Sequence, residues 1–301
     1  MTDQDSADHP DPRATLQGLS GALAQLVAAT APAIVAVHSH RSRSSGFAWR
    51  PGLVVTADEA LAEEGEVALA LPDGARVPAS IAGRDPTTDI ALLRIERTDL
   101  TPAKLGGARP ATGAIAVVVG SEGDGPRAAL GIVSRSGGAW QSMRGGEIDA
   151  RLELGIRLGR RSEGGLALDA AGAGLGMAVF GPRRRVLVIP AATIERVASR
   201  LETHGRIARG YLGLGLQPVA VESGEEQGAM VMSVDRRGPG ALAGVQQGDI
   251  VVAWDGAPIG HWHSVLRALG PESVGRTVTL GLRRAGEMRQ LQLTIAERPV
   301  A

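Results

Sequence analysis

The sequence contains no cysteine, and aromatic residues make up only 2% of its 301 residues. Without cysteine, the chain has no disulfide framework, no thiolate nucleophile and no thiolate metal site. Because stacked aromatic side chains hold the bases of single-stranded nucleic acids, their scarcity argues against that function. Basic and acidic side chains balance at 32 each, so no net charge draws the whole protein toward polyanions. We therefore expect no nucleic-acid partner.

The remaining composition is that of a folded protein with many turns. Apolar residues make up 44% of the chain and charged residues 21%, a balance that excludes disorder throughout. A chain of this length can bury a large core and is long enough for two domains. Its 42 glycines and 17 prolines favour short strands joined by turns over long helices.

The N-terminal region carries no recognisable targeting or membrane segment. Residues 1–18 are polar and acidic, lack the basic region of a secretory signal, and are predicted to be a disordered tail. Residues 19–37 are apolar, but Gln25 and Pro32 interrupt them, which favours a short helix to about Ala29 and then a strand over a membrane span. If Met1 is the true start, the absence of an export signal predicts a cytoplasmic protein.

Short strands dominate the pattern from residue 46 to residue 190. The segment "EVALALPDGARVPASIAG" has two alternating runs joined by Pro-Asp-Gly, which indicates a hairpin. Regular strands of this kind are typical of a sandwich or barrel. Residues 191–205 have apolar residues at helical spacing and end on Gly205, so they are predicted to form an amphipathic helix. The segment "GRIARG" then links to a second domain.

Two segments resemble a known family. "LPDGARVPASIAGRDPTTDIALLRIE" resembles the segment that carries the catalytic Asp of HtrA/Deg serine proteases, and "GPGALAGVQQGDIVVAWDGAPI" resembles a PDZ signature. The resemblance implies a mostly β protein with a trypsin-like double β-barrel at residues 19–206 and a PDZ domain at residues 207–298. It also implies a trimer, which is usual in the family, and no cofactor.

The family's catalytic triad transfers only in part. The Asp position falls on Asp89, which is retained, but counting from Thr56 places Glu59 at the His position. The Ser position, counted back from the Gly-Gly pair at 164 and 165, falls on Glu163. The resemblance therefore implies a peptidase fold that lacks the catalytic His and Ser.

A register shifted by one residue would make Ser162 the nucleophile. In that register Glu163 takes the place of the glycine that must follow the serine. The glycine of the oxyanion hole is replaced by Arg160 or Arg161, depending on the register. Ser162 would also lack an adjacent base to activate its hydroxyl. Residual proteolysis through Ser162 stays open as the less favoured alternative.

If the transfer holds, Glu59, Asp89 and Glu163 converge. Such a cluster is costly unless it is compensated. We expect these carboxylates to be solvated or paired with Arg160 and Arg161, and we prefer this to binding of Ca²⁺ or Mg²⁺, so no metal is predicted. The pairs His38/His40 and His261/His263 lack further ligands and are weak metal signals.

The PDZ half has the features of a peptide-binding module. The segment "YLGLGL" resembles the loop whose backbone N–H groups hold a peptide's terminal carboxylate, and the strand from Leu214 would accept a peptide by β-augmentation. The helix in "WHSVLRALG" would supply apolar contacts, which implies ligands with an apolar C-terminal residue. The predicted peptide-binding residues are Tyr211, Leu212, Gly213, Leu214, Gly215, Leu216, Val265 and Leu269.

Three functions follow from these patterns. The first is an HtrA-like pseudoprotease that binds peptides or protein C-termini through its PDZ domain. The second is an active trypsin-like serine endopeptidase with a non-standard site. The third is a purely structural oligomeric component. We favour the first.

Overall fold

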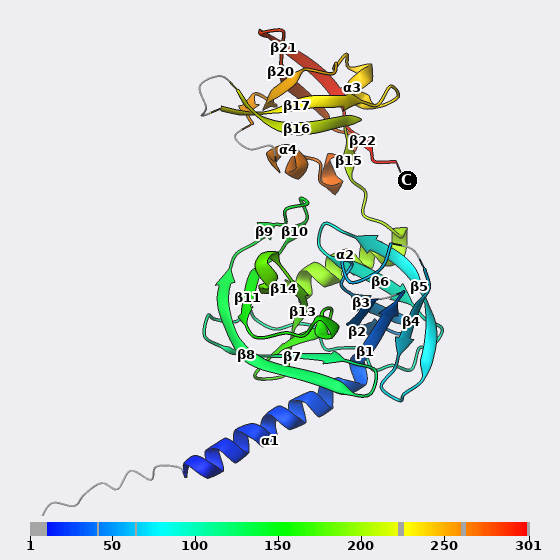
Figure 1. Ribbon diagram of the computed structural model, residues 1–301, viewed down its shortest axis with the longest axis vertical. Coiled ribbons are helices and arrows are strands. Elements are labelled where there is room, and N and C mark those ends of the chain that lie inside the picture. The colour runs from blue at the N-terminus through cyan, green and yellow to red at the C-terminus, as the bar shows by residue number, and fades with distance from the viewer. Residues whose placement is uncertain (1–10, 41, 64, 222–225, 260–262, 300–301) are drawn as a thin grey trace, which may run out of the picture. The chain divides into compact units, whose positions relative to one another are not determined.

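The computed structural model describes residues 11–40, 42–63, 65–221, 226–259 and 263–299 (Figure 1). The chain divides into two compact units. The first comprises Met1–Gly83, Asp89–Gly138 and Ala150–Ala198. The second comprises Arg84–Thr88, Ala139–Asp149 and Ser199–Ala301, so two short segments from the N-terminal half join the C-terminal unit.

The first barrel closes in the order β1-β2-β3-β6-β5-β4. Its strands are β1 (Ile34–Ser39), β2 (Ser42–Arg50), β3 (Leu53–Thr56), β4 (Val67–Ala70), β5 (Arg76–Asp85) and β6 (Ile90–Arg94). β4 and β5 form the predicted Pro-Asp-Gly hairpin, which is confirmed. The interior is filled by aliphatic side chains, among them Val35, Val37, Leu69 and Leu93, each fully buried. A closed barrel leaves no free sheet edge.

The second barrel closes in the order β11-β14-β13-β12-β7-β8. Its strands are β7 (Ile115–Ser121), β8 (Pro126–Gly137), β11 (Arg151–Gly155), β12 (Leu166–Asp169), β13 (Gly174–Phe180) and β14 (Val186–Pro190). Two short 3₁₀ turns interrupt it, η2 (Arg160–Ser162) and η3 (Pro182–Arg184). The mostly β architecture with two six-stranded barrels is thus confirmed.

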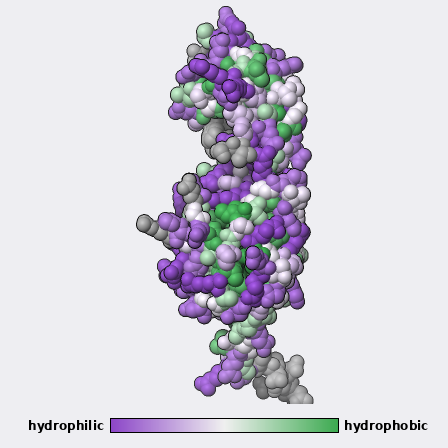
Figure 2. Space-filling view, turned by 90° about the vertical axis from the view of Figure 1, so that its right-hand side faces the viewer, coloured by the Kyte–Doolittle hydropathy of each residue, from purple (hydrophilic) through white to green (hydrophobic). Residues whose placement is uncertain are grey.

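In the space-filling view, hydrophilic residues cover most of the visible face and apolar residues gather in patches between them (Figure 2).

Two longer helices belong to the N-terminal part of the fold. Helix α1 (Pro12–Thr30) begins well before residue 19, so the predicted disordered tail is wrong for residues 12–18, and residues 1–10 lie outside the described residues. The side chain of Asp11 accepts a hydrogen bond from the Arg13 N–H, and Pro12 occupies the first turn; both features start a helix. The helix predicted at residues 191–205 is confirmed as α2 (Ala191–His204), in which Ile194 and Leu201 are fully buried.

No helix within the described ranges is long and apolar enough to cross a bilayer. This finding agrees with the interpretation of residues 19–37 as a helix followed by a strand. The turn η1 (Ala31–Ala33) separates the two elements, and Pro32 lies inside it. Proline is compatible with the first turn of a helix but ends the preceding one, which explains the boundary.

The C-terminal unit contains a sheet in the order β16-β17-β18-β20-β21, with β19 paired to β18. Its elements are β15 (Gly210–Tyr211), β16 (Leu214–Val221), β17 (Glu226–Val234), α3 (Pro239–Leu242), β18 (Ile250–Trp254), β19 (Ala257–Pro258), α4 (His263–Ala268), η4 (Pro271–Ser273), β20 (Thr277–Arg284), β21 (Glu287–Thr294) and β22 (Ala296–Glu297). The hairpin β9 (Trp140–Gln141) and β10 (Glu147–Ile148) lies in the segment Ala139–Asp149. Because β16 is at the end of the strand order, one of its edges is unpaired within the described sheet.

Candidate functional site

Strands β3 and β6 bring the first two predicted site residues together. The strands pair so that Thr56 faces Ala91, which places the turn after β3 beside the residue before β6. In this arrangement the backbone N–H of Glu59 donates a 2.7 Å hydrogen bond to the carboxylate of Asp89. Asp89 has φ +58°, a left-handed conformation that non-glycine residues adopt at a cost. The carboxylate is therefore held in a strained and specific position.

Glu163 follows η2 and is fixed by three hydrogen bonds. Its carbonyl accepts from the N–H of Ser45 at 2.7 Å, and its side chain accepts from the N–H of Phe180 at 3.3 Å. Its own N–H donates to the carbonyl of Arg160 at 3.2 Å. Gly164 comes next with φ +83°, and a Cβ there would collide with the carbonyl oxygen of Ser45. Only glycine fits at this point of the turn.

Charge repulsion shows that the three carboxylates share one site. The pKa of Asp89 is raised to about 7, mainly by burial and also by the charges of Glu59 and Glu163, while the hydrogen bond from the N–H of Glu59 opposes the shift. Burial also raises the pKa of Glu163; its hydrogen bond from Phe180 opposes this shift, while the charge of Glu59 adds to it. The structure thus brings Glu59, Asp89 and Glu163 together. Their roles in chemistry remain predictions.

The arginines near this cluster are partly those expected. Arg160 lowers the pKa of Glu163 through its charge, as does Arg184. Arg161, the other expected partner, forms an ion pair with Glu122 at 3.4 Å. Arg184 was not among the predicted partners, because nothing in the neighbouring sequence indicates that the loop between β13 and β14 returns to Glu163. The run of three arginines at 183–185 was the available signal.

Ser162, the alternative nucleophile, is held inside the turn. Its side chain is only 4% exposed, its N–H donates to Gly159, and its carbonyl accepts from Gly165. It lines a cleft of about 720 Å³. Its role as a nucleophile stays a prediction.

The histidine pairs named in the sequence are only partly described by the structure. Burial lowers the pKa of His38, and the charges of Arg76 and Arg43 lower it further. His261 lies outside the described residues, so the His261/His263 pair is not defined. Among the residues that the structure describes, no group of three or more histidine, aspartate or glutamate side chains is placed to hold a metal ion.

The predicted carboxylate-binding loop leads into an edge strand. Gly213 has φ +71°, and a Cβ there would crowd Gly238. The carbonyl of Leu212 accepts from Gly240 and that of Gly213 from Asp235, whereas the N–H groups of Leu212 and Gly213 donate to no described residue. Successive unpaired N–H groups of this kind form an anion-binding concavity.

Apolar side chains lie beside this loop. Leu214, Leu216 and Leu269 are partly buried and pack against the core of the C-terminal unit. Val265 in α4 is only 1% exposed and belongs to that core, so in this structure it supports the surface from beneath. Gly215 alternates with these leucines along β16, as the period of a strand requires. Tyr211 donates its hydroxyl to Asp235 at 3.0 Å.

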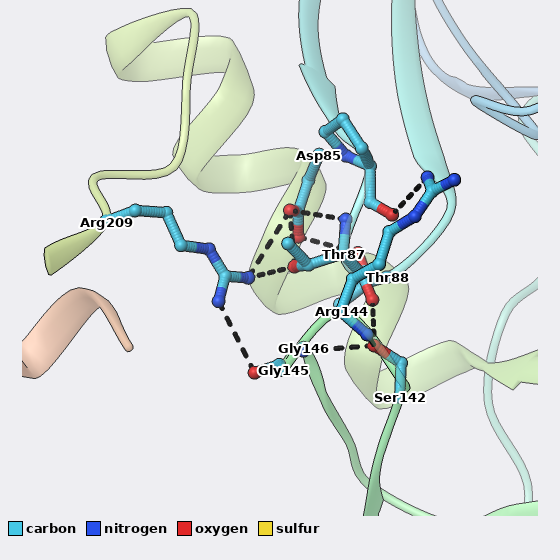
Figure 3. Close-up of polar contacts among 9 residues, drawn as sticks. Asp85, Thr87, Thr88, Ser142, Arg144, Gly145, Gly146 and Arg209 are labelled. Atoms are coloured by element: carbon cyan, nitrogen blue, oxygen red, sulfur yellow. Dashed lines mark hydrogen bonds and ion pairs between the residues drawn. The ribbon is translucent and has the colours of Figure 1, made fainter. Parts of the chain in front are cut away.

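A buried polar cluster anchors the segment just before the loop (Figure 3). The guanidinium of Arg209 contacts the hydroxyl of Thr87 and the carbonyl of Gly145, and it lies 3.6 Å from the carboxylate of Asp85. Asp85 is 3% exposed at its side chain and also accepts from the hydroxyls of Thr87 and Thr88. Burial lowers the pKa of Arg209, and the charge of Asp85 opposes this shift. No sequence pattern indicated this cluster, since Thr87 and Arg209 are 122 residues apart.

Two domain families match the chain. The trypsin-like peptidase domain matches residues 44–177 and the PDZ domain matches residues 210–295. Solved structures share the fold: an HtrA-type protease AlgW with a decapeptide is 23% identical, with a TM-score of 0.70 over 92% of this chain and 99% of that one. A serine endoprotease from Yersinia pestis is 24% identical, with a TM-score of 0.70 over 91% of this chain and 98% of that one.

Curated relatives agree with this class. A probable periplasmic serine endoprotease DegP-like from Bartonella henselae is 29% identical over 281 residues, which are 87% of this chain and 55% of that protein. A protein of the same name from Brucella suis is 28% identical over 275 residues, covering 86% and 53%. The fold and both domains are thus those of a trypsin-like peptidase with a PDZ module. The chain is thus similar to HtrA/DegP-like serine proteases in both of its domains.

The chain spans about half the length of the curated relatives that it matches. Those relatives are named periplasmic, so the comparisons do not support the cytoplasmic location expected from the N-terminal sequence.

Proposed function

We propose that this chain binds peptides or protein C-termini through its PDZ domain and does not hydrolyse them. The observation that carries the proposal is the turn at Glu163. A carboxylate occupies the place before the Gly-Gly pair where a nucleophilic serine would lie, and the N–H of the same residue donates to Arg160. That N–H is one of the donors an oxyanion hole needs, and here an internal carbonyl uses it.

The base position supports the same conclusion. Glu59 donates its backbone N–H to Asp89, which is the contact expected of a residue in the base position beside the retained Asp. Glu59 carries a carboxylate, and its charge opposes the ionisation of Asp89. A triad works because an acid stabilises an imidazolium, and two carboxylates repel each other instead.

The peptide-binding proposal rests on the loop before β16. The free N–H groups of Leu212 and Gly213 can hold a terminal carboxylate, and the open edge of β16 can pair with an extended peptide. Leu214, Leu216 and Leu269 are only partly buried and can contact an apolar C-terminal side chain. Binding in the micromolar range is expected for a small surface with few anchors.

This proposal is tested with two forms of one peptide. The full chain is titrated with a fluorescent peptide that ends in an apolar residue, once as the free acid and once as the C-terminal amide. We expect amidation to weaken binding by at least about tenfold, since it removes the charge that the loop N–H groups stabilise. Equal affinity for the two forms would refute a carboxylate-binding role for the loop.

Peptide hydrolysis is the second candidate function. The names of the curated relatives and the position of Ser162 on the wall of the cleft favour it. The same names favour a periplasmic location, a proposal that rests on the relatives alone. The trimer implied by the family resemblance also stays a prediction.

A further inference from the structure

One cleft in the barrel unit is lined by charged side chains of a single sign. It has a volume of about 720 Å³ and lies between the start of β8, the segment before η2 and the segment after β13. Its charged lining residues are Arg127, Arg157 and Arg184, and no described aspartate or glutamate lines it. A cleft with low-dielectric walls concentrates the field of such charges.

Two of these cations form no ion pair within the described part of the chain. Arg127 forms an ion pair with Glu122 at 2.5 Å. Arg157 and Arg184 form no ion pair with any carboxylate that the structure describes, although the charge of Arg184 also acts on Glu163. The guanidinium of Arg184 lies 4.9 Å from the centre of the Phe180 ring, which fixes the direction of the planar group. The cleft therefore keeps two guanidinium groups that no described carboxylate engages directly.

The backbone beneath Arg184 is strained. Arg183 has φ +58° and Arg184 has φ +57°, two successive arginines in the left-handed region. Residues other than glycine adopt this conformation at an energetic cost, and strain of this kind concentrates at ligand-contacting segments. Glycine would remove the strain but also the guanidinium. The turn thus holds an arginine over Phe180 at an energetic cost.

Apolar side chains complete the cleft. Phe180 and Leu158 line it beside the arginines, so a purely ionic ligand would leave apolar surface uncovered. Arginine binds carboxylates with two parallel hydrogen bonds, which suits it to acidic side chains. We infer that this cleft binds an acidic peptide segment, with its carboxylates on Arg157 and Arg184 and neighbouring apolar side chains on Phe180. This site goes beyond the proposed PDZ function, because it requires no free C-terminus.

The test uses a peptide that the PDZ loop cannot hold. The full chain is titrated with a fluorescent hexapeptide of alternating leucine and glutamate that is blocked at its C-terminus by amidation, and with the same peptide carrying glutamine for glutamate. We expect the glutamate peptide to bind and the glutamine peptide to bind about tenfold or more weakly. Because the amide removes the terminal carboxylate, failure of the PDZ proposal leaves this result unchanged.

Variants identify the arginines responsible. Arg157→Gln and Arg184→Gln should each weaken binding about tenfold, the effect of losing a charge-assisted hydrogen bond. Arg184→Lys keeps the charge but loses the planar fork, and should weaken binding less than Arg184→Gln. Arg94→Gln is the matched control, since Arg94 is exposed on β6 and does not line the cleft.

Three outcomes would overturn the inference. The first is equal binding of the glutamate and glutamine peptides. The second is an equal loss of affinity in Arg94→Gln and Arg157→Gln, which would mean that only overall charge matters. The third is tighter binding of a short RNA of the same charge, which would make the cleft a general polyanion surface. Arg157 is exposed, so its replacement tests binding without endangering the fold.

Discussion

Replacing Asp89 by asparagine should make the protein more stable above neutral pH. Burial and the neighbouring carboxylates raise the pKa of Asp89 from its ordinary value of 3.8 to about 7. Asparagine removes the titration but keeps an oxygen that can accept the hydrogen bond from Glu59. It also tolerates the left-handed backbone, since asparagine is among the residues that adopt φ near +58° most readily.

The sign follows from linkage. Below about pH 3 both the folded and the unfolded protein hold the proton of Asp89, and the site costs nothing. As pH rises from about 3 to 7, the unfolded chain loses this proton first, so stability falls and then levels off above pH 7. A shift of about 3 pKa units corresponds to about 4 kcal/mol as an upper limit. Because Asp89 is partly exposed to water, we expect about 2 kcal/mol.

Urea unfolding followed by circular dichroism measures this effect. At pH 8 the midpoint of Asp89→Asn should exceed that of the parent by about 1 M urea, and at pH 3 the two midpoints should coincide. Asp124→Asn removes an exposed carboxylate and serves as the control, with no change expected at either pH. A difference between Asp89→Asn and the parent that is the same at both pH values would refute the description of a buried, mutually repelling carboxylate cluster.

Two further predictions concern stability. Arg209→Ala leaves the buried carboxylate of Asp85 without its cation, so it should destabilise the C-terminal unit by about 3 kcal/mol in urea unfolding. Arg209→Lys should recover part of this loss, and equal stability of Arg209→Ala and the parent would contradict the role of the ion pair. Gly164→Ala should lower stability by about 3 kcal/mol, because its Cβ would meet the carbonyl of Ser45 in a left-handed turn, and an unchanged midpoint would show that the turn can relax.

The fold could be predicted because its local signals agree with its long-range packing. The Pro-Asp-Gly turn fixes the hairpin of β4 and β5, and the apolar spacing of Ile194 and Leu201 fixes the buried face of α2. The predicted disordered tail was wrong for residues 12–18 because of local capping: Asp11 and Pro12 start α1 there, although the acidic composition suggested disorder.

Site positions could be predicted only where they lie a fixed number of residues from a recognisable strand or turn. Counting from Thr56 and from Gly164 located Glu59 and Glu163, because both positions are set by a neighbouring strand. The contacts of Arg184 with Phe180 and of Arg209 with Asp85 depend on how loops fold back onto the rest of the chain. Local sequence patterns do not indicate which loops meet in this way. The raised pKa of Asp89 depends mainly on burial, which becomes visible only in three dimensions.

The most direct test of the central claim is labelling of the full chain with a fluorophosphonate probe, beside an active serine protease as a positive control. The account predicts no labelling and no turnover of unfolded casein above buffer. This expectation rests on the proposal that Glu163 takes the place of the nucleophile and Glu59 that of the base, and on the hydrogen bond that the N–H of Glu163 donates to Arg160. Labelling that maps to Ser162 and disappears in Ser162→Ala would contradict the account and establish the chain as an active protease.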